Sequence, residues 1–168
     1  MKITTRTEYG IRVLVTLARG PEGAEEDRCQ SLSEIARREK LPHAYLEQII
    51  GDLRRAQLVT ATRGQSGGYR LARPAGDIAM ADVVRALEGP ILEMPCAGMD
   101  DFEHCDRPQP CSVHEVFQRV YESLSTSLAT TNLAEVAAGP GGPPYPQHVR
   151  RRRQASLTIT PKQEARNA

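Results

Sequence analysis

Three cysteines close together are the residues of this chain whose types and spacing best suit metal chemistry. Cys96, Cys105 and Cys111 follow the pattern Cys-x8-Cys-x5-Cys, and the stretch around them is rich in Pro, Gly and Asp. Because Pro and Gly allow sharp bends, the three thiolates can converge on one centre. Thiolates are the ligands that iron–sulfur clusters prefer, and they also bind zinc. The pattern therefore predicts an iron–sulfur cluster, with a Cys3His zinc site, a metal-free loop or a disulfide as alternatives.

A fourth ligand is needed to complete either metal site. His114 lies three residues after Cys111, in the first turn of a predicted helix. The positive end of that helix disfavours imidazolium and favours a neutral ring that can bind metal. His104, next to Cys105, is a weaker candidate. We interpret Cys29, which lies in a distant acidic segment, as incidental.

Composition places the chain among ordinary globular proteins, with 39% hydrophobic and 26% charged residues and a formal net charge of +1. This net charge neither supports nor excludes nucleic-acid binding, since local patches matter more than the sum. No stretch approaches the roughly 18 consecutive apolar residues of a membrane helix. The apolar N-terminal segment lacks the small-residue cleavage site of a signal peptide. We expect a cytoplasmic protein with no membrane partner, in which thiols stay reduced.

The elements that must position these residues are mainly helical, with one small β-hairpin. Apolar residues at helical spacing predict five helices, over residues 5–20, 32–40, 42–56, 78–88 and 112–136. Capping-box patterns mark three of the helix starts, at Thr5–Glu8, Ser31–Glu34 and Ser112–Glu115. Two strand-like runs, residues 58–62 and 69–72, flank a glycine-rich segment and predict the hairpin.

Two short helices, a tight turn and a following β-hairpin describe a winged helix-turn-helix. The second helix, residues 42–56, would lie in a DNA major groove, where Glu47 can accept from cytosine and Gln48 can pair with adenine. Arg63 at the hairpin tip would reach a minor groove or a phosphate. Each side chain alone is equally typical of a solvated surface, so the prediction depends on the order of the elements.

Several motifs together resemble one bacterial family. They are Leu-Pro-His-Ala-Tyr-Leu-Glu-Gln-Ile-Ile at 41–50, Leu-Arg at 53–54, Leu-Val at 58–59, Arg-Gly at 63–64, Gly-Gly-Tyr-Arg-Leu-Ala at 67–72, the opening residues 1–9 and Ala-Leu-Glu-Gly-Pro at 86–90. On these motifs the chain, over about residues 1–136, resembles the IscR/NsrR-like family of iron–sulfur winged helix-turn-helix transcriptional regulators. The match is most specific in residues 41–72.

The resemblance implies a DNA-binding surface on the second helix and the wing. By motif, Glu47 and Gln48 would read bases and Arg63 would enter the minor groove. Ala44 replaces a serine that some members use for base contact, so the preferred operator can differ. The full set of DNA-binding residues that we predict is His43, Tyr45, Glu47, Gln48, Arg54, Arg63, Gly64 and Gly68.

The resemblance also bears on the fourth ligand and on cluster type. Some relatives use a histidine just beyond the last cysteine, which points to His114. Others use an acidic residue at the position of Glu8, donated by the partner subunit, although here Glu8 also fits a capping box with Thr5. The first cysteine interval is wider than is usual in the family, which leaves both a 2Fe–2S and a 4Fe–4S cluster open.

The predicted organisation has four parts. Residues 1–92 form the winged helix-turn-helix domain, 93–111 the cysteine loop, 112–136 a dimerisation helix, and 137–168 a disordered tail rich in Pro, Gly and Arg. The apolar stripe of the fifth helix would pack against a second copy, through Val113, Val116, Phe117, Val120, Leu124 and Leu128.

No acid–base constellation of an enzyme is visible. We therefore predict a homodimeric, non-enzymatic regulator, of the repressor type, that binds a double-stranded DNA operator. Its cluster would sense iron–sulfur status, redox state or nitric oxide. The alternative is a cluster-free or zinc-binding winged-helix regulator that uses its cysteines as thiol sensors.

Overall fold

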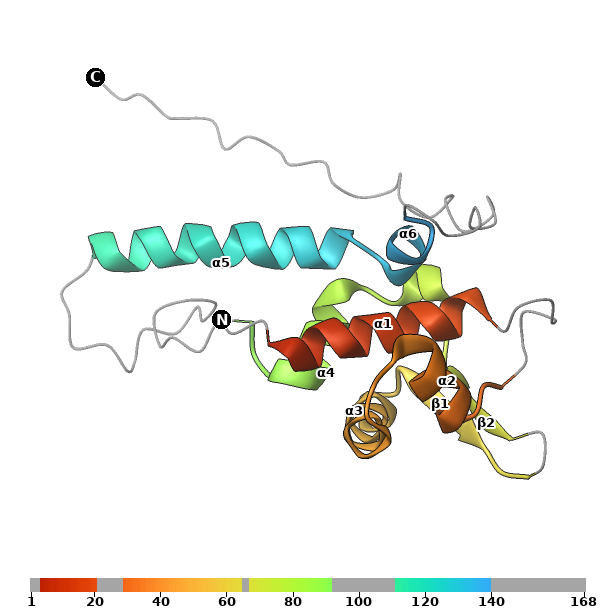
Figure 1. The fold of residues 1–168 in the computed structure, drawn as a ribbon. Helices are drawn as coiled ribbons and strands as arrows, with labels where there is room; N and C mark the ends of the chain where they lie inside the picture. Colours follow the sequence, from red (N-terminus) through yellow and green to blue (C-terminus); the bar gives the residue numbers. More distant parts are fainter. Residues whose placement is uncertain (1–3, 21–28, 65–66, 92–110, 140–168) are drawn as a thin grey trace, which may run out of the picture.

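The computed structural model describes residues 4–20, 29–64, 67–91 and 111–139. Within these ranges the fold is mainly helical with one two-stranded antiparallel hairpin (Figure 1), which confirms the predicted fold class. The elements are α1 (Thr5–Arg19), α2 (Leu32–Glu39), α3 (His43–Arg55), β1 (Val59–Thr62), β2 (Gly68–Leu71), a 3-10 turn (Ala75–Asp77), α4 (Met80–Glu88), α5 (Ser112–Thr130) and α6 (Leu133–Ala137).

Of the three predicted capping boxes, one is correct. At the start of α2 the Ser31 hydroxyl accepts a hydrogen bond from the Glu34 amide, and the Glu34 carboxylate accepts one from the Ser31 amide. The box predicted at Thr5 is wrong by one residue, because Thr4 is the N-cap and accepts from the Arg6 amide. Thr5 is therefore already inside the helix, where its hydroxyl cannot serve the same amides.

The box predicted at Ser112–Glu115 is also wrong. Cys111 is the N-cap residue of α5 and makes no side-chain capping bond, while Ser112 is the first helical residue. Glu115 instead lies 2.8 Å from Arg119 one turn further along the helix. The shift places the sulfur-bearing residue at the N-terminus of the helix.

The core is aliphatic and is built mainly where α1, α3 and α4 meet. Leu14, Leu46, Ile49 and Val83 are fully buried in it. Gly10 lets α1 and α4 approach closely, because a Cβ there would lie 2.2 Å from Leu87 Cδ1. The two helices are therefore packed too tightly to slide past one another without repacking.

The C-terminal helix prediction needs correction, since residues 112–136 are two helices and not one. α5 ends at Thr130, and Asn132 caps α6 by accepting from the Glu135 amide at 2.9 Å. Asparagine favours such caps over a helix interior. Leu133 is fully buried in the core, and its amide donates to the Ile78 carbonyl at 2.9 Å. The core of the winged domain thus takes in α6 as well as residues before 92.

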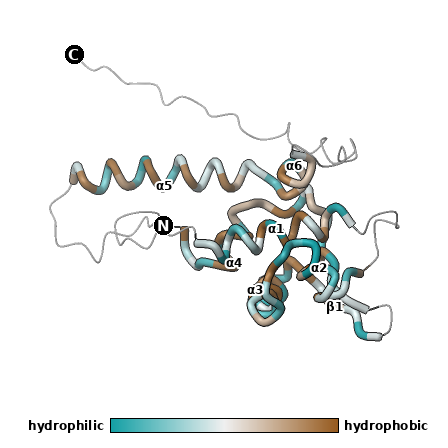
Figure 2. Tube along the Cα trace, in the orientation of Figure 1, coloured by the Kyte–Doolittle hydropathy of each residue, from teal (hydrophilic) through white to brown (hydrophobic). Residues whose placement is uncertain are grey.

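The apolar residues of α5 divide between two directions. Tyr121, Leu124 and Leu128 pack on a second apolar cluster formed by Ala81, Val84 and Ile91. Val113, Val116 and Val120 remain 47%, 54% and 42% exposed. Figure 2 shows hydrophobic residues recurring along α5, including the part that extends beyond the end of α1. The outward-facing valines are unusual for a surface of a lone domain.

Asp52 was predicted to lie off the buried stripe of α3, and this is wrong. Its carboxylate is buried and pairs with Arg6 of α1 and Arg55 of its own helix. A buried carboxylate is tolerated only with such partners. The helical period alone could not reveal the partner on α1.

Glu88, the last residue of α4, clamps the start of α1 and carries a testable pH dependence. It accepts hydrogen bonds from the Thr4 amide and from the hydroxyls of Thr4 and Thr7. Burial by itself would raise the pKa of Glu88, but these hydrogen bonds together lower it below its ordinary value. The stabilisation is therefore present at neutral pH and is lost as pH falls below about 4.5 through the lowered pKa of the folded state.

We expect the Glu88→Gln variant to be less stable than the parent at pH 7 and to lose less stability between pH 5 and pH 3. Urea unfolding followed by circular dichroism across this range measures both effects. The exposed Asp77, changed to asparagine, provides the control for removing one carboxylate. Parallel pH profiles of the parent and the Glu88→Gln variant would contradict the assignment.

Candidate DNA-binding surface and cysteine segment

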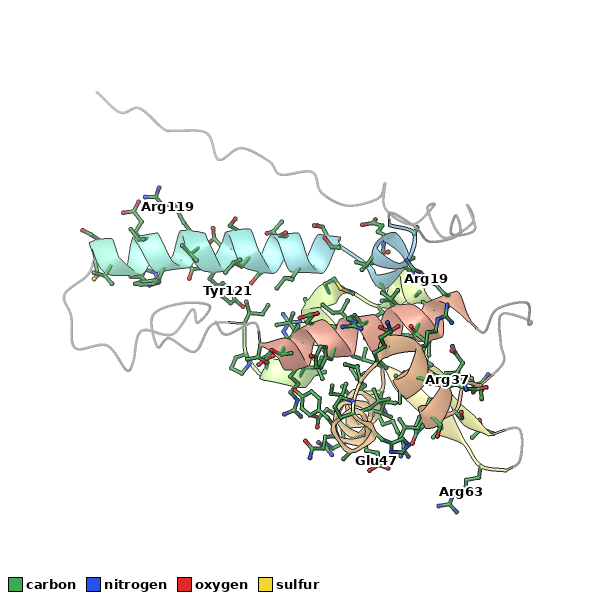
Figure 3. The ribbon with its side chains drawn as sticks, viewed as in Figure 1. Arg19, Arg37, Glu47, Arg63, Arg119 and Tyr121 are labelled. Carbon is green, nitrogen blue, oxygen red and sulfur yellow. The ribbon has the colours of Figure 1, made fainter. Side chains whose placement is uncertain are left out.

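The orientation of α3 is set by its buried stripe. Leu46, Ile49, Ile50 and Leu53 face the core, so the opposite side of the helix faces solvent. Glu47 and Gln48 lie on this outer side and are exposed. Figure 3 shows Glu47 projecting away from the body of the molecule. The helix therefore presents a polar, accessible face of the kind that reads a major groove.

The first turn of α3 contributes two further predicted residues with different environments. His43 Nδ1 lies 3.5 Å from Glu47 Oε1, so the structure brings these two predicted residues together. Tyr45 is half-buried, and its ring packs edge-on against Tyr9 of α1 with centroids 5.8 Å apart. Tyr45 thus anchors α3 to α1, and a contact to DNA would use only its exposed part.

The hairpin places Arg63 beyond the strands. β1 and β2 pair from Val59↔Leu71 to Thr62↔Gly68, and Arg63 is exposed just after β1. In Figure 3 the side chains of Arg63 and Glu47 project from the same side of the molecule. Gly64 adopts φ +118°, which a residue with a Cβ would adopt only under strain.

The base of the hairpin is fixed by a residue that sequence reasoning missed. Gln30 pairs with Tyr69 through two backbone hydrogen bonds of 2.9 and 2.8 Å, and its side-chain amide donates to the Thr16 carbonyl of α1 at 3.0 Å. Gly68 lies directly against this bridge, where a Cβ would come within 2.5 Å of the Gln30 carbonyl oxygen. This packing is sufficient reason for glycine at 68, and its contact with DNA stays a prediction.

Arg54 lies at a recess of about 550 Å³ between the end of α3 and the hairpin. Thr60 and Arg73 also line this recess, and Arg73 pairs with Asp82 at 2.7 Å. Arg54 is exposed. A guanidinium in this position suits a DNA phosphate better than a base edge.

The structure describes only one end of the predicted metal site. Cys96, Cys105 and His104 lie outside the described residues. Cys111 and His114 are both half-buried at the N-terminus of α5 and line one recess of about 590 Å³. The positive end of a helix stabilises a thiolate. In the parts of the chain that are described, no group of three potential metal-ligating side chains comes together.

Glu8 is accessible to an external partner. Its side chain is 62% exposed, and its Oε1 lies 3.6 Å from Arg12 Nη1. It takes no part in the capping box with which the sequence paired it, because Thr4 occupies the N-cap position. None of the helices in the described ranges is long and apolar enough to span a membrane.

Comparison with known proteins identifies relatives of the whole fold. The family model Rrf2, described as an iron-dependent transcriptional regulator, matches residues 3–139. An rrf2-like HTH-type transcriptional regulator of Rhodobacter capsulatus is 34% identical over 141 residues, which is 81% of this chain and 92% of that protein. An HTH-type regulator of Mycobacterium tuberculosis is 31% identical over 149 residues, covering 89% of this chain and 86% of that protein.

Solved structures agree. CymR, the global cysteine regulator of B. subtilis, has a TM-score of 0.65 and 31% identity, over 82% of this chain and 97% of that one. T. potens IscR has a TM-score of 0.61 and 33% identity, over 81% of this chain and 85% of that one. Regulators of this family bind DNA and are not enzymes. The fold, the exposed recognition helix and these matches confirm the resemblance noted in the sequence: the chain belongs to the Rrf2 family of transcriptional regulators.

Proposed function

We propose that this regulator is a homodimeric repressor whose operator affinity is controlled by an iron–sulfur cluster bound by Cys96, Cys105 and Cys111. The observation that carries the DNA-binding part is the common direction of Glu47 on α3 and Arg63 on the wing. One DNA duplex can meet both, with α3 in a major groove and the wing in the neighbouring minor groove. A twofold dimer would present two such surfaces about 34–36 Å apart.

The cluster part is supported by the chemistry of the donor set. Cys111 lies at the positive end of α5, with His114 in the same recess as a potential fourth ligand. When bound, a cluster supplies a redox-active and chemically labile group. Cys111 joins it to α5, and the family description is that of an iron-dependent regulator. A change at the cluster would therefore be felt at the helix that we assign to the dimer.

The dimer is supported by the outward face of α5. Val113, Val116 and Val120 form an exposed apolar row at helical spacing, and a second copy of the same helix would cover it. The opposite face of α5 is already packed against α4. The two roles of the helix are thus on different faces.

Val116 tests this assignment. We expect Val116→Glu to shift the protein from dimer to monomer and to weaken operator binding, because two carboxylates would face each other across the twofold axis. Multi-angle light scattering gives the mass, and Glu122→Ala, which alters an exposed polar position of the same helix, is the control. A Val116→Glu variant that stays dimeric would exclude this face as the interface.

The cofactor is tested by anaerobic purification with visible and EPR spectroscopy of the wild type, Glu8→Ala and His114→Ala. A brown or red protein is expected, and the variant that lacks the fourth ligand should show an altered spectrum. Unchanged spectra in both variants would exclude both candidate ligands. Colourless wild type with zinc or no metal would overturn the cluster.

A second candidate is a regulator whose cysteines act directly as thiol sensors or bind zinc. It is favoured by the similarity to CymR, the global cysteine regulator, since that likeness covers most of both chains. Reversible oxidation of Cys111 without iron would support it. Metal analysis together with thiol titration distinguishes the two candidates on one sample.

A further inference from the structure

We propose that the first turn of α1, residues 4–8, transmits the state of the cysteine segment to α3, with Arg6 and Asp52 as the positioning residues. The inference deepens the proposed function and rests on it. It does not depend on which residue is the fourth ligand.

The first turn of α1 is joined to the recognition helix by a buried ion pair. Arg6 pairs with Asp52 near the C-terminal end of α3, and the Asp52 side chain is only 8% exposed. Arg55 is its other partner. Losing one partner of a buried carboxylate is costly, so α3 is expected to follow any movement of Arg6.

The same turn is joined to the helix that leads into the cysteine segment. Glu88 accepts from Thr4 and Thr7, and Glu88 ends α4. Ile91, three residues later, is buried against the α4–α5 contact and is the last residue described before that segment. A pull on the chain beyond Ile91 is therefore applied close to the Glu88 clamp.

The packing gives this clamp little freedom. Gly10 and Leu87 bring α1 and α4 so close that no Cβ would fit between them. α1 and α4 should therefore move together as one packed unit, in steps that repack their surroundings. The movement then reaches α3 through Arg6–Asp52 and the edge-on contact of Tyr9 with Tyr45.

A third connection reaches the first helix of the helix-turn-helix. Arg12, one turn after Glu8, lies 3.6 Å from Glu8 and 3.0 Å from Glu39 at the end of α2. The start of α1 thus contacts α2, α3 and α4 through charged groups. We infer that it sets the angle of the DNA-reading unit relative to α4.

The test compares the Kd of cluster-loaded and cluster-free protein for a duplex enriched from a random-sequence library by the wild type. We expect a wild-type Kd ratio of about 5–150 between the two states. In Asp52→Asn and Arg6→Gln the ratio should fall to near one, while iron content stays at the wild-type level. Asp77→Asn, the same chemical change at an exposed site, should keep the wild-type ratio.

The outcomes separate the two proposals. A large ratio in the wild type that persists in Asp52→Asn and Arg6→Gln would overturn the transmission role and leave the proposed function intact. A wild-type ratio of one would overturn cluster sensing itself. If Asp52→Asn does not fold, Arg6→Gln decides, because it leaves Asp52 with Arg55 as a partner.

Discussion

We expect the Cys111→Ser variant to be isolated without the visible absorption of an iron–sulfur cluster and with an operator affinity that no longer responds to iron or oxidant. A serine hydroxyl stays protonated at neutral pH and is a poor ligand for iron, whereas a thiolate is a strong one. Cys111 is also the N-cap of α5, so its loss breaks the connection from the cluster to that helix. The effect should be a loss of all bound iron, measured by absorption and iron analysis.

Cys29→Ser is the matched control, since it removes a thiol at a different place. The Cys29 sulfur lies 3.6 Å from the Thr62 hydroxyl at the end of β1, beside the wing. This variant should keep its iron and its colour. A colourless Cys29→Ser protein, or a Cys111→Ser protein with full iron content, would contradict the assigned ligand set.

We expect the next largest effects at the DNA surface. Gln48→Ala should cost about 1–3 kcal/mol of operator affinity and relax selection at a single base pair, as for a side chain that reads one base. Arg63→Ala should weaken binding and reduce its dependence on minor-groove width, because the arginine would no longer enter a narrow groove. Fluorescence anisotropy on the enriched duplex and on single-base variants measures both.

Arg119→Ala is the control for the loss of a positive charge. Arg119 lies on α5, pairs with Glu115 and projects on the side away from Glu47 and Arg63 (Figure 3). Its removal should leave operator affinity unchanged. If Gln48→Ala and Arg63→Ala bound the duplex as tightly as wild type, α3 and the wing would not be the reading surface.

Local patterns were sufficient for much of the fold. The Ser31–Glu34 box, the stripe of α3 and the glycine-rich hairpin are each specified within a few residues, so periodicity and turn chemistry could predict them. The Thr5 box failed by one residue because Thr4 has the same chemistry and also meets Glu88, which is 84 positions away. Such a choice is made by tertiary contacts.

The candidate site shows the same division. Glu47, Gln48 and Arg63 could be placed on an exposed surface from their helix and hairpin positions. Asp52, Gln30 and Glu88 could not, because their partners come from other elements and carry no short-range signal. Asn132 did carry a signal, as a helix-capping residue, but the apolar residues on both sides suggested one continuous helix.

The return of α6 to the core has a consequence for synthesis of the protein. Leu133 fills a fully buried position, and truncation of such a leucine typically costs about 2–5 kcal/mol. A nascent chain that ends before α6 lacks this contact and the pairing of Ala79 with Asn132. The groove-binding unit therefore matures only after all three sensor cysteines have been translated, so an unfinished polypeptide on the ribosome is a poor competitor for the operator.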